Sequence, residues 1–210
     1  VWWRMAITAV ILGVALKWAG QLQRIDIKKA KPAIISGIIL AFHWLCFFAS
    51  IKYSNVTIAL STLASTAMFS TLIQSAIARR RPIAKELIAS IFTIVGVGVV
   101  FQFQELHVVG IVLGLMSAFL GATFTIITEK LLKEQSPYNL LFVQLLGGVG
   151  VLTLITPVVV FNNPNLALLP AGWDWVYLLI LAGVCTAYAM KLSYDALKVV
   201  SSFILNLSTN

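Results

Sequence analysis

The chain has 210 residues, of which 60% are hydrophobic and only 10% are charged, and its formal net charge is +8. An ordinary soluble domain carries about 25% charged residues, so this composition excludes a soluble globular protein. The basic residues lie between long apolar stretches, which argues against a nucleic-acid partner.

A helix needs about 20 apolar residues to cross the hydrocarbon core of a membrane, and the sequence offers a series of such stretches. In chain order they predict helices at residues 3–19, 33–51, 56–78, 84–104, 107–132, 137–160 and 173–194, with an eighth beginning near residue 197. The intervening loops are short, apart from 20–31 and 161–172. We therefore predict an all-α integral membrane protein, a polytopic helix bundle surrounded by the lipid bilayer.

The basic residues divide unevenly between the two sides of the membrane if successive helices alternate in direction. One side carries 13 of the 15, and only Arg4 and Lys52 fall on the other. Because cytoplasmic loops are enriched in Lys and Arg, we expect the crowded side to face the cytoplasm. The protein is then a multi-pass protein of the bacterial inner (plasma) membrane. The loops expected to be cytoplasmic are 20–31, 79–85, 129–136 and 191–198.

Two windows of the sequence align without gaps at a constant offset of 146 residues. Gly37 pairs with Gly183, and Lys52 pairs with Lys198. The paired helices are five spans apart, and this odd separation makes the two copies cross the membrane in opposite directions, as in the inverted repeats of many transporters. Pairings of this kind also arise by chance in apolar helices, so the repeat is supported chiefly by its agreement with the helix count.

Several stretches of the chain resemble EamA-type transporters of the drug/metabolite transporter (DMT) superfamily. They are WWRMAITAVIL, HWLCFFASIKYSNVTIAL, STLASTAMFSTLIQSAIARRRP, IVGVGVVFQF and AYAMKLSYDALKVVSSFILNLSTN. The resemblance implies inverted five-helix repeats and ten helices in the full-length protein, with about seven to eight of them here. Residues 1–105 would then hold most of the first half (helices 2–5), and residues 106–210 a truncated second half (helices 6 to the start of 9).

The two ends of the sequence predict that the chain is a piece of a longer protein. It opens on Val1, and it closes at Asn210 inside an apolar segment, where a terminus would leave backbone groups unpaired at membrane depth. The resemblance implies that about one helix precedes the chain and two follow it. The Leu-Glu-Pro signature of the family would follow Asn210, and its counterpart near residues 65–67 has neither acid nor proline.

Polar side chains inside predicted spans are costly in lipid and mark candidate substrate sites. His43 and Trp44 lie in the middle of a span, where the imidazole can titrate or bind substrate and the indole can stack on it. A buried histidine that is hydrogen-bonded to a neighbouring helix is the alternative. Arg4 can clamp a carboxylate or a phosphate, or it can extend to the membrane interface.

The predicted helix 56–78 carries a row of small hydroxyl side chains, of which Thr62, Ser65 and Thr66 are expected to line a cavity. Close packing of helices explains most of the row equally well. Weaker cavity candidates of the same kind are Gln144, Tyr188 and Asn206.

Other features favour packing or exclude chemistry. Gly110 and Gly114 have the small-x-x-x-small spacing of closely packed helices, and Glu129 is expected to be a solvated or paired charge at a helix end. The sequence contains no Walker A loop, no His-Glu-x-x-His, no Cys-x-x-Cys and no Gly-x-Ser-x-Gly motif. We therefore predict no catalytic residue, no cofactor and no metal site.

The sequence thus predicts a secondary transporter, a permease or exporter that moves small metabolites such as amino acids by alternating access around a midplane cavity. The expected partners are a small-molecule substrate and the bilayer, and the protein is predicted to act as a monomer or homodimer. Proton coupling through His43 and simple facilitated exchange both remain open. The alternatives are a membrane-embedded enzyme that uses His43 and a membrane scaffold that transports nothing.

Overall fold

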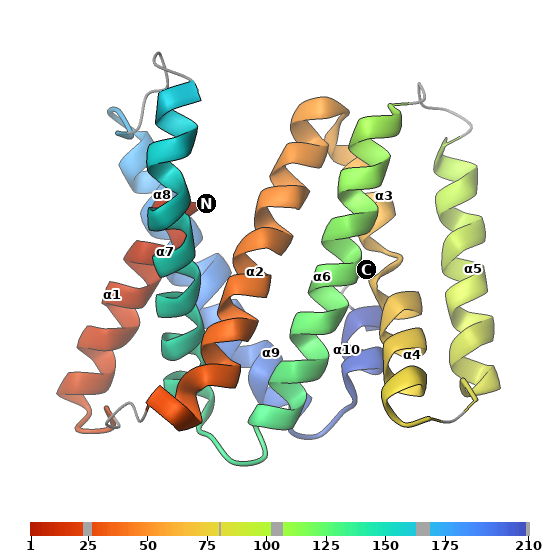
Figure 1. The fold of residues 1–210 in the computed structure, drawn as a ribbon, viewed down its shortest axis with the longest axis horizontal. Coiled ribbons are helices and arrows are strands. Elements are labelled where there is room, and N and C mark those ends of the chain that lie inside the picture. Colours follow the sequence, from red (N-terminus) through yellow and green to blue (C-terminus); the bar gives the residue numbers. More distant parts are fainter. Residues whose placement is uncertain (23–26, 80, 102–106, 163–168, 209–210) are drawn as a thin grey trace. The chain divides into compact units, whose positions relative to one another are not determined.

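The computed structural model describes residues 1–22, 27–79, 81–101, 107–162 and 169–208, and Figure 1 shows their helices. In chain order these are α1 (Trp2–Trp18), α2 (Ile27–Tyr53), α3 (Val56–Leu63), α4 (Thr66–Ile77), α5 (Ala84–Phe101), α6 (Val108–Leu131), α7 (Pro137–Asn162), α8 (Asp174–Ala182), the π-helix η1 (Gly183–Tyr188), α9 (Ala189–Leu197) and α10 (Ser202–Ser208). The described residues contain no strand, so the predicted all-α class is confirmed. The boundary between residues 105 and 106, and parts of loops 20–31, 79–85 and 161–172, lie outside the described residues.

Five helical stretches in the described part of the chain are long and apolar enough to cross a membrane. They are Ala30–Tyr53, Val56–Ile77, Val108–Leu131, Pro137–Asn162 and Asp174–Leu197. The sequence also predicts spans at α1 and α5, which are 17 and 18 residues long. Both lengths are near the lower limit of about 17 residues for a spanning helix.

Two segments predicted as loops contain helical residues in the structure. Helix α2 begins at Ile27 rather than at residue 33, because lysine is a good helix former and the helix continues beyond the apolar stretch. Helix α9 extends to Leu197, so most of the predicted loop 191–198 is helical, and α10 begins later than predicted. Lys191 and Asp195 form an ion pair of 2.6 Å, and such a pair four residues apart supports an additional helical turn.

Two predicted helices are interrupted. The helix predicted at 56–78 divides into α3 and α4 around Ala64 and Ser65. The Thr62 hydroxyl donates to a backbone carbonyl of α3, and the Thr66 hydroxyl at the start of α4 donates back to the carbonyl oxygen of Leu63 at the end of α3. Such bonds from a hydroxyl to the preceding turn often bend helices. The helix predicted at 173–194 contains η1, a wider π-helical stretch of the kind that is frequent at functional sites.

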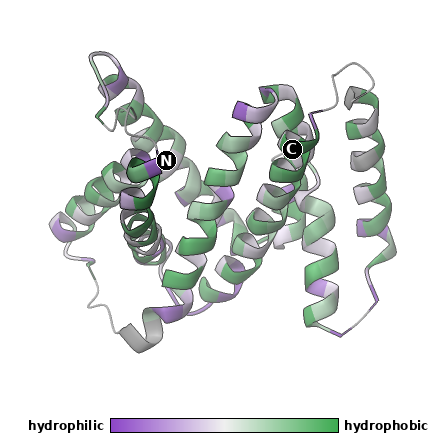
Figure 2. Cartoon of the chain, turned by 45° about the horizontal axis from the view of Figure 1, so that its top comes forward, coloured by the Kyte–Doolittle hydropathy of each residue, from purple (hydrophilic) through white to green (hydrophobic). Residues whose placement is uncertain are grey.

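The distribution of polar and apolar side chains is the reverse of that in a soluble protein. Small polar residues such as Thr8, Ser70 and Ser117 are fully buried, whereas large apolar residues such as Phe92 and Leu154 are exposed. Figure 2 shows helices covered mostly by hydrophobic residues. In lipid this surface faces hydrocarbon, and the interior polar groups bond between helices. The chain is therefore a polytopic helical membrane protein.

The helices pack into two compact units. The first unit comprises Val1–Ala41 and Leu131–Asp195, and the second comprises Phe42–Lys130 and Ala196–Asn210. Each unit contains residues from both predicted sequence halves. The predicted division into residues 1–105 and 106–210 therefore differs from the division into compact units, and it stays a prediction. Helices α3 and α10 begin at Val56 and Ser202, which are 146 residues apart, the offset of the predicted repeat.

Glycines allow close contacts between helices of the first unit. A Cβ atom added at Gly37 of α2 would overlap the backbone carbonyl group of Gln144 on α7. At Gly147 of α7, an added Cβ would lie 2.6 Å from the carbonyl oxygen of Ile34. The α2 and α7 backbones are therefore in direct contact, and no larger residue fits at Gly37 without a shift of one helix.

A row of small residues serves the same purpose on α6 in the second unit. Gly110, Gly114, Ser117, Gly121 and Thr125 follow one another at intervals of three or four residues, and all are buried. A Cβ added at Gly114 would overlap the Thr62 hydroxyl oxygen. The small-x-x-x-small pair predicted at Gly110 and Gly114 is thus part of a longer packing face, which we call the small-residue face of α6.

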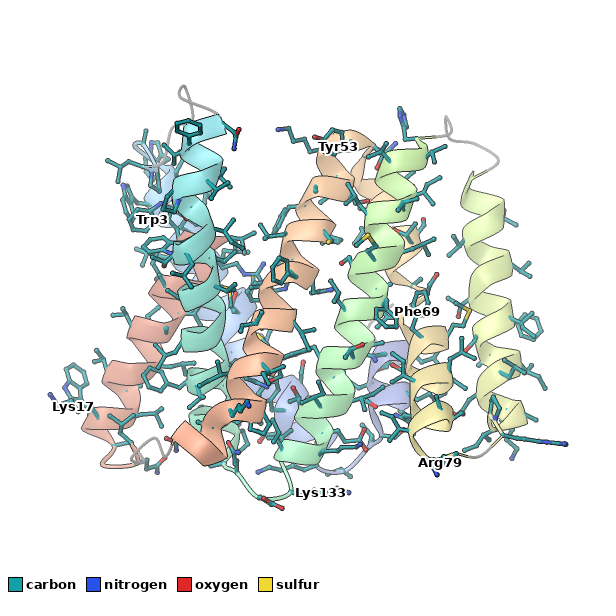
Figure 3. The ribbon with its side chains drawn as sticks, viewed as in Figure 1. Trp3, Lys17, Tyr53, Phe69, Arg79 and Lys133 are labelled. Atoms are coloured by element: carbon teal, nitrogen blue, oxygen red, sulfur yellow. The ribbon has the colours of Figure 1, made fainter. Side chains whose placement is uncertain are left out.

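Labelled residues mark the ends of each unit in Figure 3. Lys17 and Lys133 lie at one end of the first unit, and Trp3 lies away from that end. In the second unit, Tyr53 and Arg79 lie at opposite ends. These charges are therefore at helix ends, where they can reach water.

We expect Gly37→Ala to lower the stability of the protein, because the new methyl group would have to displace the backbone of α7. Overpacking costs about 1–3 kcal/mol where side chains can adjust, and here the obstacle is backbone. The measurement is the melting temperature in detergent, together with the monodisperse fraction on size exclusion.

The control for this variant is Gly150→Ala on α7, where an added Cβ meets nothing within 4 Å. This control should melt at or slightly above the wild-type temperature, since Ala is favoured over Gly in helices by about 1 kcal/mol. A wild-type melting temperature for Gly37→Ala would contradict the described contact of α2 with α7.

Candidate functional site

The nine residues predicted from the sequence as substrate contacts fall in both units. Those in the first unit are Arg4, Gln144 and Tyr188, and those in the second are His43, Trp44, Thr62, Ser65, Thr66 and Asn206.

Arg4 reaches a neighbouring helix in the first unit. Its Nε donates a hydrogen bond of 2.8 Å to the hydroxyl oxygen of Thr186, a fully buried residue of η1. The Thr186 hydroxyl in turn donates to the carbonyl oxygen of Leu181 at 2.8 Å. This contact favours the inward position of Arg4 over an extended position at the interface. The guanidinium is thereby fixed in plane, as recognition of a planar anion requires.

Hydroxyl groups satisfy the backbone around the wide turn of η1. The Thr8 hydroxyl of α1 donates to the carbonyl oxygen of Arg4 at 2.7 Å and to that of Ala182 at 3.1 Å. Thr186 provides the bond to Leu181. A π-helical turn leaves carbonyls outside the regular α-helical pattern, and in lipid each of them needs a donor. α1 therefore holds η1 in place through polar groups as well as by packing.

Gln144 links three helices of the same unit and is fully buried. Its Nε2 donates to the hydroxyl of Ser36 on α2 at 2.8 Å, and its Oε1 accepts from the Tyr194 hydroxyl on α9. These bonds make Gln144 a connection between α2, α7 and α9. Tyr188, by contrast, is 61% exposed, so the structure does not bring it to this network.

His43 forms a reciprocal contact with α6 in the second unit. Its Nδ1 lies 2.8 Å from the backbone carbonyl oxygen of Ser117 and 3.0 Å from the Ser117 hydroxyl oxygen. The Ser117 hydroxyl donates to the backbone carbonyl oxygen of His43 at 3.0 Å. His43 is half-buried, and its neighbour Trp44 is buried. The imidazole is thus bonded to a neighbouring helix, as one of the two sequence interpretations proposed.

Gly121 on the small-residue face of α6 gives room to the His43 ring. A Cβ atom added there would lie 3.0 Å from ring atoms Cε1 and Nδ1 of His43 and 3.8 Å from Cγ2 of Thr66. The structure therefore brings His43 and Thr66 to the same point on α6. Thr62 and Ser65, which precede Thr66 in the sequence, are also buried. The Thr62 hydroxyl donates to its own helix at 2.9 Å, which favours packing for this residue.

Asn206 belongs to the first of two sets of hydrogen bonds that join α4, α6 and α10. Its Nδ2 donates to the Ser70 hydroxyl on α4 at 2.6 Å, and its Oδ1 accepts from the Thr125 hydroxyl on α6 at 3.4 Å. The structure therefore makes Asn206 a buried connection between three helices.

The second set of hydrogen bonds is formed by residues that lie four positions from those of the first set on each of the three helices. Gln74 donates to the Ser202 hydroxyl, and the Glu129 carboxylate accepts from the Ser202 backbone N–H at 3.0 Å. Glu129 is half-buried near the end of α6, and its bond to the Ser202 N–H gives it a role at the start of α10 that the sequence did not predict. Among the described residues, no three His, Cys, Asp or Glu side chains could together hold a metal ion.

Sequence reasoning did not single out Ser36, Ser117, Thr186 or Tyr194, the partners of the predicted residues. Ser117 carried a signal, since it continues the spacing of Gly110 and Gly114 by three residues. The other partners lie on ordinary apolar stretches, and nothing in their spacing identifies them.

Comparison with known proteins adds one match. Residues 1–102 match the model of the EamA-like transporter family. The search of curated proteins found no match to this chain. The matched segment comprises α1 to α5, and the described helices after it continue the pattern of membrane-length apolar stretches. The resemblance seen in the sequence is therefore confirmed for residues 1–102, and this match together with the apolar helices fits an EamA-type transporter of the DMT superfamily.

Proposed function

We propose that this transporter moves small metabolites such as amino acids across the bacterial inner membrane by alternating access. The observation that carries the proposal is the family match on a chain whose division into two units runs through the helices α2 and α9 rather than through loops. The hydrogen bonds described above each stay within one unit. Alternating access in many transporters is largely a movement of one helical body against another around a central substrate site.

The substrate class follows from Arg4. An arginine side chain stays charged at any physiological pH. Its fork of N–H groups matches a carboxylate in a bidentate arrangement, and Thr186 fixes the plane of that fork through Nε. A metabolite with a carboxylate, such as an amino acid, fits this chemistry.

Transport should be measured with the full-length encoded protein in liposomes. Loaded vesicles are tested for counterflow with a panel of radiolabelled amino acids, other carboxylates and uncharged metabolites. We expect saturable uptake of at least one carboxylate-bearing compound, and none in vesicles without protein. Absence of saturable flux across the panel would refute the proposal. Conversion of a compound that requires His43 would indicate the enzyme alternative, and neither flux nor conversion would indicate a scaffold.

Replacement of Arg4 should weaken transport of a carboxylate substrate. In Arg4→Gln the amide can still donate to Thr186, so the local fold is retained while the charge is lost. A charge-assisted hydrogen bond contributes about 1.5–3 kcal/mol, so we expect KM to rise roughly tenfold to a hundredfold. Arg4→Lys should be intermediate, because it keeps the charge without the fork.

Two controls accompany the Arg4 variants. Lys17→Gln removes an exposed charge from the same helix and should leave KM unchanged. A substrate analogue with an amide in place of the carboxylate should be transported equally by wild type and Arg4→Gln. An unchanged KM for the carboxylate substrate in Arg4→Gln would exclude Arg4 from substrate binding.

The proposed orientation predicts which positions are reached from the cytoplasm. In a background with Cys46→Ala and Cys185→Ala, a cysteine at position 133 should react with a membrane-impermeant maleimide only after cells are opened. A cysteine at position 53 should react in intact cells. The reverse pattern would invert the assignment of sides.

A further inference from the structure

The strongest unassigned feature is a group of exposed cations at one end of the second unit. They lie where α4 ends, where α5 begins, at the end of α6 and just before α10. Figure 3 labels Arg79 at this end, opposite Tyr53. We call the group the basic rim, and its members are Arg79, Arg81, Lys85, Lys130 and Lys198.

Hydrogen bonds bring three of these segments together. Gln74 in the last turn of α4 donates to the hydroxyl of Ser202 at the start of α10, and the Ser202 backbone N–H donates to the carboxylate of Glu129 near the end of α6 at 3.0 Å. A cation of the basic rim lies within five positions of each of these residues in the sequence. The cations of α4, α6 and α10 are therefore gathered near one junction.

Positive charge is in excess at this junction. All five side chains of the basic rim are exposed, and none of them forms an ion pair within the part of the chain that the structure describes. The described acidic residues of the second unit are Glu86 and Glu129, both half-buried, and Glu129 is already bonded to the backbone of α10. Five cations against two carboxylates leave a field that attracts an anionic partner.

The backbone of Arg79 has a conformation that favours glycine. Its φ is 49°, and among the described residues no other non-glycine residue has a positive φ. Helix α1 ends in the same way, but there the residue after the C-cap is Gly20, with a φ of 63°. A side chain strains the backbone at such a position, whereas glycine does not. The reason for an arginine at position 79 therefore lies in its side chain and not in its backbone.

Exposed apolar side chains adjoin the basic rim. Ile77 is the last residue of α4 and of a stretch long enough to cross a membrane, and it is 55% exposed. Val199, next to Lys198, is 87% exposed. A free inorganic anion would use only the cations. A phospholipid with a negative headgroup would use both, since its phosphate meets basic residues at the membrane surface and its acyl chains meet apolar ones.

We propose that the basic rim binds the headgroup of an anionic phospholipid, such as phosphatidylglycerol, and that its acyl chains lie against Ile77 and Val199. The proposal goes beyond the transport proposed above and does not depend on it. It requires only that the second unit lies in a bilayer that contains anionic lipid.

Binding is measured through the melting temperature of the full-length encoded protein in a neutral detergent, titrated with short-chain lipids. Dihexanoyl phosphatidylglycerol should raise the melting temperature in a saturable manner, and added salt should weaken this effect by screening the charges. Dihexanoyl phosphatidylcholine has the same acyl chains and should need a roughly tenfold or higher concentration. Inorganic phosphate alone should give no shift. Equal shifts with both lipids, or with inorganic phosphate and phosphatidylglycerol, would overturn the proposal.

The double variant Lys130→Gln and Lys198→Gln tests the cations. It should raise the apparent Kd for phosphatidylglycerol roughly 25-fold, because each charge near a membrane surface contributes about fivefold. The matched control is Lys52→Gln, which removes an exposed lysine of the same unit beside Tyr53, at the end opposite Arg79. This control should bind as wild type does. Wild-type affinity in the double variant, or an equal loss in the control, would refute a site at the basic rim.

Arg79→Gly separates lipid binding from stability. Glycine relieves the left-handed backbone, so without lipid this variant should melt at or above the wild-type temperature. Its apparent Kd for phosphatidylglycerol should nevertheless rise about fivefold. Unchanged affinity would remove Arg79 from the lipid site. A lower melting temperature without lipid would show that the arginine side chain stabilises the fold by itself, and this result would also overturn the assignment of Arg79.

Discussion

The structure depends on one constraint, the lack of hydrogen-bond partners in hydrocarbon. A polar group in the middle of a bilayer must find its partner within the protein. In the described part of the chain, no buried side-chain nitrogen or oxygen lacks a partner. This constraint explains why the interior contains hydroxyls and amides in pairs, as with Gln144 and Ser36, and why large apolar side chains lie on the outside. The polar groups that hold the helices together are also those on which a transport mechanism can draw.

Much of the fold was predictable because span length is a physical requirement that the sequence displays directly. The stretches for α2, α6 and α7 were located to within a few residues, apart from the early start of α2. The interruptions were not predictable. The break at Ala64 and Ser65 and the π-helix η1 each change the backbone without a change in apolar character, and hydropathy does not respond to them. Both depend on specific bonds, such as that from Thr186 to Leu181.

The sequence was sufficient to predict candidate site residues, but not the residues to which they are hydrogen-bonded. A polar side chain in a span is conspicuous, and His43, Arg4 and Gln144 were each found in this way. Their partners are serines and threonines that resemble the many others in the chain, and Ser117 lies 74 residues from His43 in sequence. Only the fold shows that Arg4 meets η1, or that the Thr62 hydroxyl donates to its own helix. The partners of the candidate residues are therefore set by tertiary contacts, which local pattern does not encode.

The small-residue face of α6 has a consequence for how α2 is aligned on it. Helices with large side chains lock together by interdigitation, which resists a slide of one along the other. A surface of Gly and Ser offers little such resistance. Along this contact the alignment is set by hydrogen bonds at two points, from Ser50 to the Gly110 carbonyl and between His43 and Ser117. The two points are seven residues apart on both helices, which is about two helical turns. They therefore fix the register of α2 on a surface of α6 that would otherwise allow the helices to slide.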